Sequence, residues 1–195
     1  MMEVERPKPK KQIPNDAKKV FSGIIFDIYQ WEVEGYDGRK EIHEVARRHV
    51  DTVDVLPITE DGKLILSKQQ QPGLDPFIGF FGGRMIEGES PLETAKRELL
   101  EESGFEASTF ELLDAQNPIE KVDWVCYVFL AKGLKLVAKQ SLDPGERIEF
   151  LRVTFDDFMD LVSKPNFRNR DTALFLLQAQ KDPARWNEVQ AIFKP

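Results

Sequence analysis

Residues 83–105 read GRMIEGESPLETAKRELLEESGF, and this stretch decides the fold. Ser90 is a good N-cap, and Pro91 suits the first helical position because its missing N–H is not needed there. Glu93 stands three residues after the cap and completes a capping box. Gly104 can take the left-handed conformation that ends a helix. The stretch therefore predicts a helix over residues 91–103.

The carboxylates of this expected helix gather beside its apolar face. At 100° per residue, Ala95 and Leu99 lie on one stripe, and Glu98, Glu101 and Glu102 share a flank of roughly 100°. Clustered carboxylates repel one another unless they are solvated or hold a cation, and hard divalent cations prefer oxygen ligands. Taken alone, such a charged helix is typical of a solvated surface with ion pairs between residues four apart.

The complete pattern resembles the Nudix box. The matching positions are two glycines, four glutamates, one arginine and two apolar residues. They are Gly83, Glu89, Arg97, Glu98, Leu99, Glu101, Glu102, Gly104 and Phe105. Nudix hydrolases cleave the pyrophosphate of a nucleoside diphosphate that is linked to another moiety, and they use Mg²⁺ or Mn²⁺. Because the match covers residues 83–105 only, the resemblance implies the chemistry and leaves the substrate open.

The resemblance also implies roles for individual residues. The implied metal ligands are three glutamates and one backbone carbonyl, namely Glu98, Glu101, Glu102 and Gly82. The same glutamates, with Glu89 and Arg97, make up the implied catalytic set, in which Arg97 orients a carboxylate through a charged hydrogen bond. A purely structural pair between Glu89 and Arg97 stays open as an alternative.

The general base is expected outside the box. The chain resembles the ADP-ribose and nucleotide-sugar pyrophosphatase branch, and this resemblance implies that the base is a glutamate on a loop far beyond the box. Here the polar loop before the strand expected at residues 148–153 offers Glu146, with Glu149 as the second choice. Either glutamate is equally consistent with an ordinary surface carboxylate.

The flanking segments resemble the same branch, in which an amino-terminal hairpin helps to pair two subunits. A homodimer is therefore implied. Trp31, Arg47 and Arg48 are candidates for binding a base and a phosphate, although a tryptophan in a hairpin is more often a packing residue. Arg84 is a further candidate for substrate binding. Since the chain has Gln69-Gln70-Gln71 where the branch commonly has Gln-aromatic-Arg, a nucleotide sugar or a dinucleotide stays an alternative to ADP-ribose.

Composition bounds the class of protein. The chain has 195 residues, of which 41% are hydrophobic, and this suits one domain with additions. A formal net charge of −7 argues against non-specific binding to nucleic acid or to an anionic membrane. Cys126 is the only cysteine, so no intrachain disulfide can form, and its apolar surroundings predict a packing role. Because neither a membrane span nor a signal peptide is recognised, we expect a cytoplasmic protein.

We divide the chain into three parts. Residues 1–19 are rich in Lys and Pro and poor in apolar residues, which predicts a flexible tail. Residues 20–50 predict a β-hairpin whose first strand covers residues 20–34. Residues 51–195 form the expected Nudix domain, with strands over residues 51–59, 63–68, 110–115, 121–131 and 148–153, and with helices capped by Thr154 and Asp171 and begun at Pro183. The expected fold class is α/β, an α/β/α sandwich around a mixed β-sheet with an N-terminal hairpin extension.

The expected function is metal-dependent hydrolysis of a pyrophosphate bond in a nucleoside diphosphate derivative of the ADP-ribose or nucleotide-sugar type. The products would be a nucleoside monophosphate and a second phosphorylated compound. Two alternatives stay open: a catalytically silent nucleotide-binding or regulatory module on the same scaffold, and a hydrolase of dinucleotides or nucleoside triphosphates. The complete set of Glu98, Glu101 and Glu102 argues against the silent module, because a pure binder does not need all three carboxylates.

Overall fold

The structure is a computed structural model that describes residues 4–193. Within that range the chain forms three β-sheets and four helices. The strands are β1 (Lys18–Ser22), β2 (Phe26–Glu34), β3 (Lys40–Arg48), β4 (Thr52–Pro57), β5 (Leu64–Gln70), β6 (Phe77–Gly79), β7 (Phe81–Arg84), β8 (Phe105–Gln116), β9 (Val122–Asp123), β10 (Cys126–Leu136) and β11 (Arg147–Val153). The helices are α1 (Pro91–Ser103), α2 (Phe155–Val162), α3 (Arg170–Ala179) and α4 (Pro183–Ile192).

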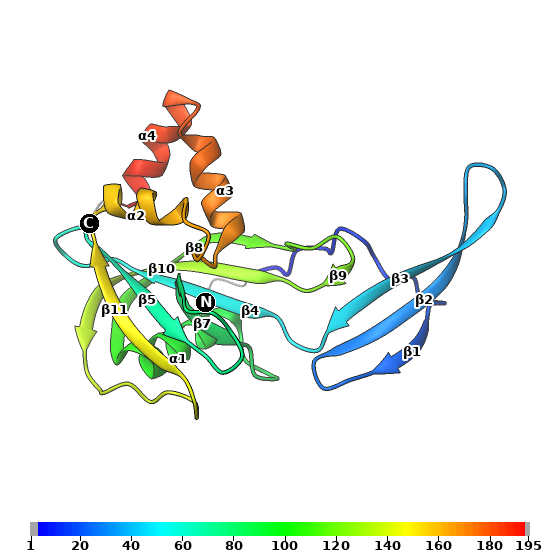
Figure 1. The fold of residues 1–195 in the computed structure, drawn as a ribbon, viewed down its shortest axis with the longest axis horizontal. Coiled ribbons are helices and arrows are strands. Elements are labelled where there is room, and N and C mark those ends of the chain that lie inside the picture. Colours follow the sequence, from blue (N-terminus) through cyan, green and yellow to red (C-terminus); the bar gives the residue numbers. More distant parts are fainter. Residues whose placement is uncertain (1–3, 194–195) are drawn as a thin grey trace.

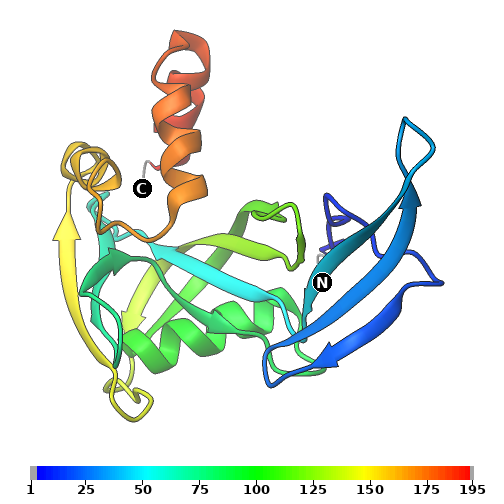
Figure 2. The same ribbon diagram turned by 45° about the vertical axis from the view of Figure 1, so that its right-hand side comes forward.

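The central layer consists of two sheets, with strand orders β7-β4-β10-β8 and β11-β5-β6. Strands β4 and β10 run parallel, whereas the other pairs in these two sheets are antiparallel, so the layer is mixed. Helix α1 lies on one side of this layer, and α2, α3 and α4 lie on the other (Figures 1 and 2). The architecture is the α/β/α sandwich that the sequence predicts.

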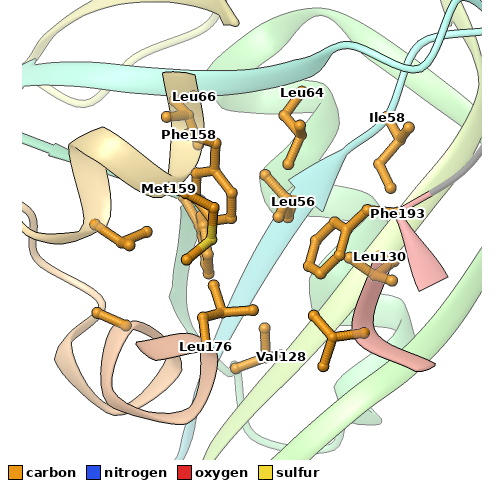
Figure 3. Close-up of a cluster of buried hydrophobic side chains, with 14 of the residues drawn as sticks. Leu56, Ile58, Leu64, Leu66, Val128, Leu130, Phe158, Met159, Leu176 and Phe193 are labelled. Atoms are coloured by element: carbon orange, nitrogen blue, oxygen red, sulfur yellow. The ribbon is translucent and has the colours of Figure 1, made fainter. Parts of the chain in front are cut away.

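Alternation along β4 explains why both sides are covered. Successive side chains of a strand point to opposite faces. Val53 and Val55 are fully buried in the cluster that contains Leu99 of α1, whereas Leu56 is buried in the cluster formed with α2, α3 and α4. Figure 3 shows the second cluster, in which Phe158 of α2 and other side chains surround Leu56. One strand therefore anchors the helices of both layers.

The amino-terminal extension is a separate sheet of order β1-β2-β3-β9. The expected hairpin is present as β2 and β3, but the prediction of one strand over residues 20–34 is wrong. The chain turns at Gly23, whose N–H donates to the carbonyl oxygen of Phe26 at 2.8 Å, and a third strand, β1, results. The boundary between extension and domain at residue 50 stays a prediction, and β3 pairs with β9 across it.

The segment before β1 contacts the domain. Arg6 forms ion pairs with Asp51 at 2.7 Å and with Asp123 at 2.9 Å, and the N–H of Lys10 donates to Asn117. Two carboxylates that face one guanidinium stabilise this position. Residues 4–17 form no helix or strand, and the flexibility of the tail stays a prediction.

Several expected boundaries are corrected. β8 begins directly after α1, at Phe105, and the strand expected at residues 121–131 is two strands, β9 and β10. Asp171 does not cap α3, because the helix begins at Arg170 and Asn169 precedes it. Within residues 4–193, no helix is both long and apolar enough to cross a membrane.

Candidate active site

Helix α1 has the caps that its sequence predicts. Ser90 accepts a hydrogen bond from the N–H of Glu93, the side chain of Glu93 accepts one from the N–H of Ser90, and Pro91 occupies the first turn. Gly104 ends the helix with a φ of 74°, and its N–H donates to the carbonyl oxygen of Leu100. Because these contacts lie within a few residues of one another, local chemistry alone sets both ends of α1.

Glu102 is the most deeply buried carboxylate of α1, with only 7% of its surface exposed. Its Oε2 accepts a hydrogen bond of 2.7 Å from the N–H of Gly82. Burial raises the pKa of Glu102 to about 8, the nearby charges of Glu98 and Glu146 act in the same direction, and the Gly82 hydrogen bond opposes them. Negative charge at this position is therefore unfavourable unless a cation lies beside it.

Two glycines leave space for these carboxylates. Gly82 has a φ of 146°, and an added Cβ there would lie 2.1 Å from the carbonyl oxygen of Val53. An added Cβ at Gly83 would lie 2.4 Å from Oε1 of Glu98. Glycine is required at Gly82 by the backbone and at Gly83 by the position of Glu98.

Arg97 links the other carboxylates of the box. Its Nε donates to Oε1 of Glu89 at 2.9 Å, and its Nη1 donates to Glu98 at 2.8 Å and to Glu101 at 3.0 Å. These charged hydrogen bonds hold the pKa of Glu89 down to about 2, with Arg97 as the largest cause and Thr94 as a further donor. The structural pair between Glu89 and Arg97 is thus present, and the same guanidinium orients Glu98 and Glu101.

The carboxylates of α1 have the chemistry of a site for a hard divalent cation. All are oxygen donors, and the buried Glu102 lies close enough to Glu98 and Glu146 for their charges to raise its pKa. Among residues 4–193, however, no group of three or more His, Cys, Asp or Glu side chains has converged in a metal-binding arrangement. Arg97 donates to Glu98 and Glu101, and the N–H of Gly82 donates to Glu102.

A cavity of about 1000 Å³ lies next to these groups. Its walls come from α1, from β4 and β7, from residues 141–146 and from residues 168–172. Of the predicted site residues it is lined by Gly82, Arg84, Arg97, Glu98, Glu101, Glu102, Arg48 and Glu146. The structure therefore brings together residues that are more than 90 positions apart in the sequence, from Arg48 to Glu146.

The two candidate bases, Glu146 and Glu149, have different surroundings. Glu146 lines the cavity, and its Oε1 accepts a hydrogen bond of 3.1 Å from Gln71. Burial raises the pKa of Glu146, and the charge of Asp143 adds to this effect. Glu149 is on β11, pairs with Lys68 at 3.0 Å and does not line the cavity. Only Glu146 is placed to act on a ligand in the cavity.

Five arginines line the cavity, namely Arg48, Arg84, Arg97, Arg168 and Arg170. Arg97 is held in ion pairs, and within the described part of the chain the other four form none. Arg48 lies over the ring of Trp124 at 5.3 Å, and its buried Nε has no hydrogen-bond partner. Burial lowers the pKa of Arg48, as do the charges of Arg84 and Arg168. The arginines without an ion-pair partner are therefore available to bind an anionic group in the cavity.

Two predicted substrate residues lie outside this cavity. Arg47 pairs with Asp123 at 2.9 Å and lies over the ring of Tyr29, because adjacent residues of a strand point to opposite faces. The ring of Trp31 packs edge-on against that of His43, with centroids 6.0 Å apart. Within one chain, Arg47 and Trp31 are thus not brought together with the carboxylates of α1.

Asp54, Arg168 and Asn169 are among the residues that line the cavity and that the sequence did not predict. The side chain of Asn169 donates to Oδ2 of Asp54 at 2.7 Å, and the thiol of Cys126 donates to the same oxygen at 3.2 Å. Burial raises the pKa of Asp54. An acidic residue between Val53 and Val55 in an apolar strand was the available signal. Arg168 and Asn169 carried no such signal, because they follow α2 in a polar connection.

Comparisons with known proteins agree with this arrangement. A family model described as the NUDIX domain matches residues 48–177. The ADP-ribose pyrophosphatase of Bacillus subtilis is 33% identical over 175 residues, which are 84% of this chain and 94% of that protein. The ADP compounds hydrolase NudE of Escherichia coli is 29% identical over 174 residues, or 84% of this chain and 89% of that protein.

Two further relatives broaden the comparison. The methanol dehydrogenase activator of Bacillus methanolicus is 26% identical over 171 residues, which are 86% of this chain and 92% of that protein. A solved structure described as the crystal structure of an ADP compounds hydrolase superposes with a TM-score of 0.69 at 25% identity. The superposition covers 90% of this chain and 95% of that one.

Proposed function

The chain belongs to the Nudix hydrolase family, and from this membership we propose that its substrate is ADP-ribose or a closely related ADP-linked diphosphate. It is a hydrolase that acts on pyrophosphate bonds. One observation carries the proposal: a single cavity holds the carboxylates of α1 together with Arg48 and Arg84, which have no ion-pair partner among residues 4–193. Such a cavity suits a diphosphate, because the arginines can bind its oxygens and the carboxylates can hold a divalent cation that neutralises them.

The box residues divide into two roles. Glu98, Glu101 and Glu102, with the carbonyl of Gly82, would hold Mg²⁺ or Mn²⁺, which when bound neutralises phosphate oxygens and acidifies the attacking water. Arg97 orients Glu98 and Glu101 through hydrogen bonds of 2.8 and 3.0 Å. Glu89 in turn fixes Arg97 from the other side.

Glu146 is the proposed general base. Its raised pKa and its position on the cavity wall support this role, because a base works best when its pKa lies near the working pH. Glu146→Gln should lower kcat by about 10²- to 10⁴-fold. Glu149→Gln should leave kcat unchanged, because Glu149 pairs with Lys68 outside the cavity. Equal effects of the two variants would reject the assignment.

The test of the function is a substrate panel. The purified protein is incubated with Mg²⁺ and ADP-ribose, nucleotide sugars, dinucleotides or nucleoside triphosphates, and the phosphorus-containing products are identified. We expect AMP and ribose 5-phosphate from ADP-ribose, no turnover in Glu102→Gln, and full turnover in the exposed control Glu111→Gln. Binding of these compounds without any hydrolysis would instead indicate a regulatory nucleotide-binding module.

We further propose that two copies associate through the sheet β1-β2-β3-β9. Support comes from large apolar side chains exposed on this sheet: Phe21 is 59% and Ile42 61% exposed. In a homodimer, Trp31 and Arg47 would be available to the cavity of the partner. Light scattering should give twice the chain mass of 22.5 kDa, and Phe21→Lys should reduce it to one chain.

We also propose a cytoplasmic location. The net charge of −7 supports a small-molecule substrate rather than nucleic acid or an anionic membrane surface. The only cysteine, Cys126, donates its thiol hydrogen to Asp54 and is not needed in a disulfide. Fractionation of cells that express the chain should place it with the cytosolic proteins.

A further inference from the structure

The connection between α2 and α3 brings an arginine to the cavity in a fixed position. Phe167, which is 1% exposed, is part of the core and forms an isolated bridge to Ile78 of β6. The N–H of Arg168 donates to the carbonyl oxygen of Ile78 at 2.8 Å, and the N–H of Ile78 donates to that of Asn166 at 2.9 Å. The backbone at Arg168 and just before it is thus attached to β6.

Asn169 fixes the other end of this connection. Its side chain donates to Asp54 at 2.7 Å and accepts from the N–H of Phe80 at 2.9 Å. It makes no cap hydrogen bond to α3, although it occupies the N-cap position. An added Cβ at Gly79 would lie 2.9 Å from Oδ1 of Asn169, so the fit between the connection and β6 is tight.

The guanidinium of Arg168 lies over the ring of Phe77, with its Cζ 4.5 Å from the centroid. This contact leaves the N–H groups of the guanidinium free to bind a ligand in its plane. Within residues 4–193 no carboxylate forms an ion pair with Arg168, and no side-chain hydrogen bond of Arg168 is present. Its neighbour Arg170, by contrast, donates to the carbonyl oxygens of Lys164 and Pro165.

The charge of Arg168 acts on three titratable groups that line the cavity. Burial raises the pKa of Glu146 and of Asp54, and the charge of Arg168 opposes this rise; burial lowers the pKa of Arg48, and the charge of Arg168 adds to this effect. Two guanidiniums that face one cavity repel each other unless an anion lies between them. Residues 71–76, which connect β5 and β6, include no Lys or Arg, and Arg168 lies over Phe77 at the end of this connection.

Resting on the function proposed above, we propose that Arg168 is a specificity-determining residue that binds a phosphate oxygen of the substrate diphosphate, with Arg48 as its partner. The connection that carries it is held by Ile78 and Asn169, and Phe77 orients the guanidinium. Phosphate matches the planar fork of an arginine, which donates two parallel hydrogen bonds. A ligand that lacks a phosphate at this point leaves Arg168 and Arg48 unneutralised and binds more weakly.

Kinetics of three variants test the proposal. Arg168→Met keeps the stem over Phe77 and removes the charge, and Arg168→Lys keeps the charge and removes the fork. Arg185→Ala is the matched control, because Arg185 lies over the ring of Phe175 at 4.9 Å and does not line the cavity. With ADP-ribose and Mg²⁺, we expect KM to rise about 10- to 100-fold in Arg168→Met, about tenfold or less in Arg168→Lys, and not in Arg185→Ala. The value of kcat should change little, because a contact made equally in ground and transition states alters KM.

Calorimetry with inorganic pyrophosphate and Mg²⁺ gives a readout that does not depend on turnover. We expect the Kd to rise in Arg168→Met by a similar factor and to stay unchanged in Arg185→Ala. If ADP-ribose is not hydrolysed while the Kd for pyrophosphate rises in Arg168→Met, the substrate is wrong and the role of Arg168 stands. If ADP-ribose is hydrolysed and Arg168→Met behaves as Arg185→Ala in both assays, the role of Arg168 is wrong. Absence of pyrophosphate binding by the unchanged protein would also overturn it.

Discussion

Gly83→Ala offers a sharp test of the site, because it displaces the carboxylate of Glu98 without substituting Glu98 itself. The new Cβ would lie 2.4 Å from Oε1 of Glu98, whereas ordinary contact begins at 3.4 Å, so the carboxylate must move by about 1 Å. Gly83 does not have a positive φ, so the backbone itself accepts alanine. The displaced Glu98 would lose its hydrogen bond of 2.8 Å from Arg97.

The magnitude follows from these contacts. Loss of a charged hydrogen bond destabilises the folded protein by about 1.5–3 kcal/mol. Alanine also lowers the entropy of the unfolded chain, which stabilises the folded protein by about 0.4–1 kcal/mol, so the net loss of stability is about 1–2 kcal/mol. A misplacement of about 1 Å in a catalytic group costs about 100-fold in rate. We therefore expect a folded protein whose kcat is about 100-fold lower.

The assay is Mg²⁺-dependent hydrolysis of ADP-ribose, with the midpoint of urea unfolding measured on the same preparations. Gly35→Ala is the control, because Gly35 lies in the hairpin turn, also lacks a positive φ, and an added Cβ there meets Asp37 at 3.3 Å. Gly35→Ala should keep full activity. If Gly83→Ala retained the kcat of the unchanged protein, the position of Glu98 would not matter for the reaction and the reasoning would be refuted.

Three further changes have defined outcomes. Arg97→Lys loses the fork that joins Glu89 to the helix carboxylates, and kcat should fall about 10- to 100-fold; unchanged kcat would show that one point charge suffices. Leu99→Ala empties a fully buried position under α1 and should cost about 2–5 kcal/mol in urea unfolding, so a loss below 1 kcal/mol would contradict tight packing there. Lys19 is the largest cause that holds the pKa of Asp27 well below its ordinary value. The stability this contributes is present in full above pH about 4 and is lost gradually as the pH falls toward the lowered pKa, so Asp27→Asn should lower the urea midpoint more at pH 7 than at pH 2.

The relation between Arg47 and Arg48 illustrates what a sequence pattern leaves open. Both residues are on β3, and alternation requires that they point to opposite faces. The pattern does not tell which face meets the cavity. The register with β2 and the short pairing with β9 decide this, and they direct Arg47 to Asp123 and Arg48 to Trp124.

The amino-acid sequence by itself determined α1, its caps and the carboxylates on its flank, because these features depend on interactions between residues a few positions apart. The alternating apolar strands were predictable for the same reason, and the resemblance to the Nudix box implied the α/β/α class. The break at Gly23 and the roles of Asp54, Arg168 and Asn169 were decided only by the tertiary structure. Asp54 and Asn169 are 115 positions apart and are joined by one hydrogen bond of 2.7 Å, and no local rule brings such a pair together. Packing of the helices against both faces of the sheet sets that contact, and with it the shape and charge of the cavity.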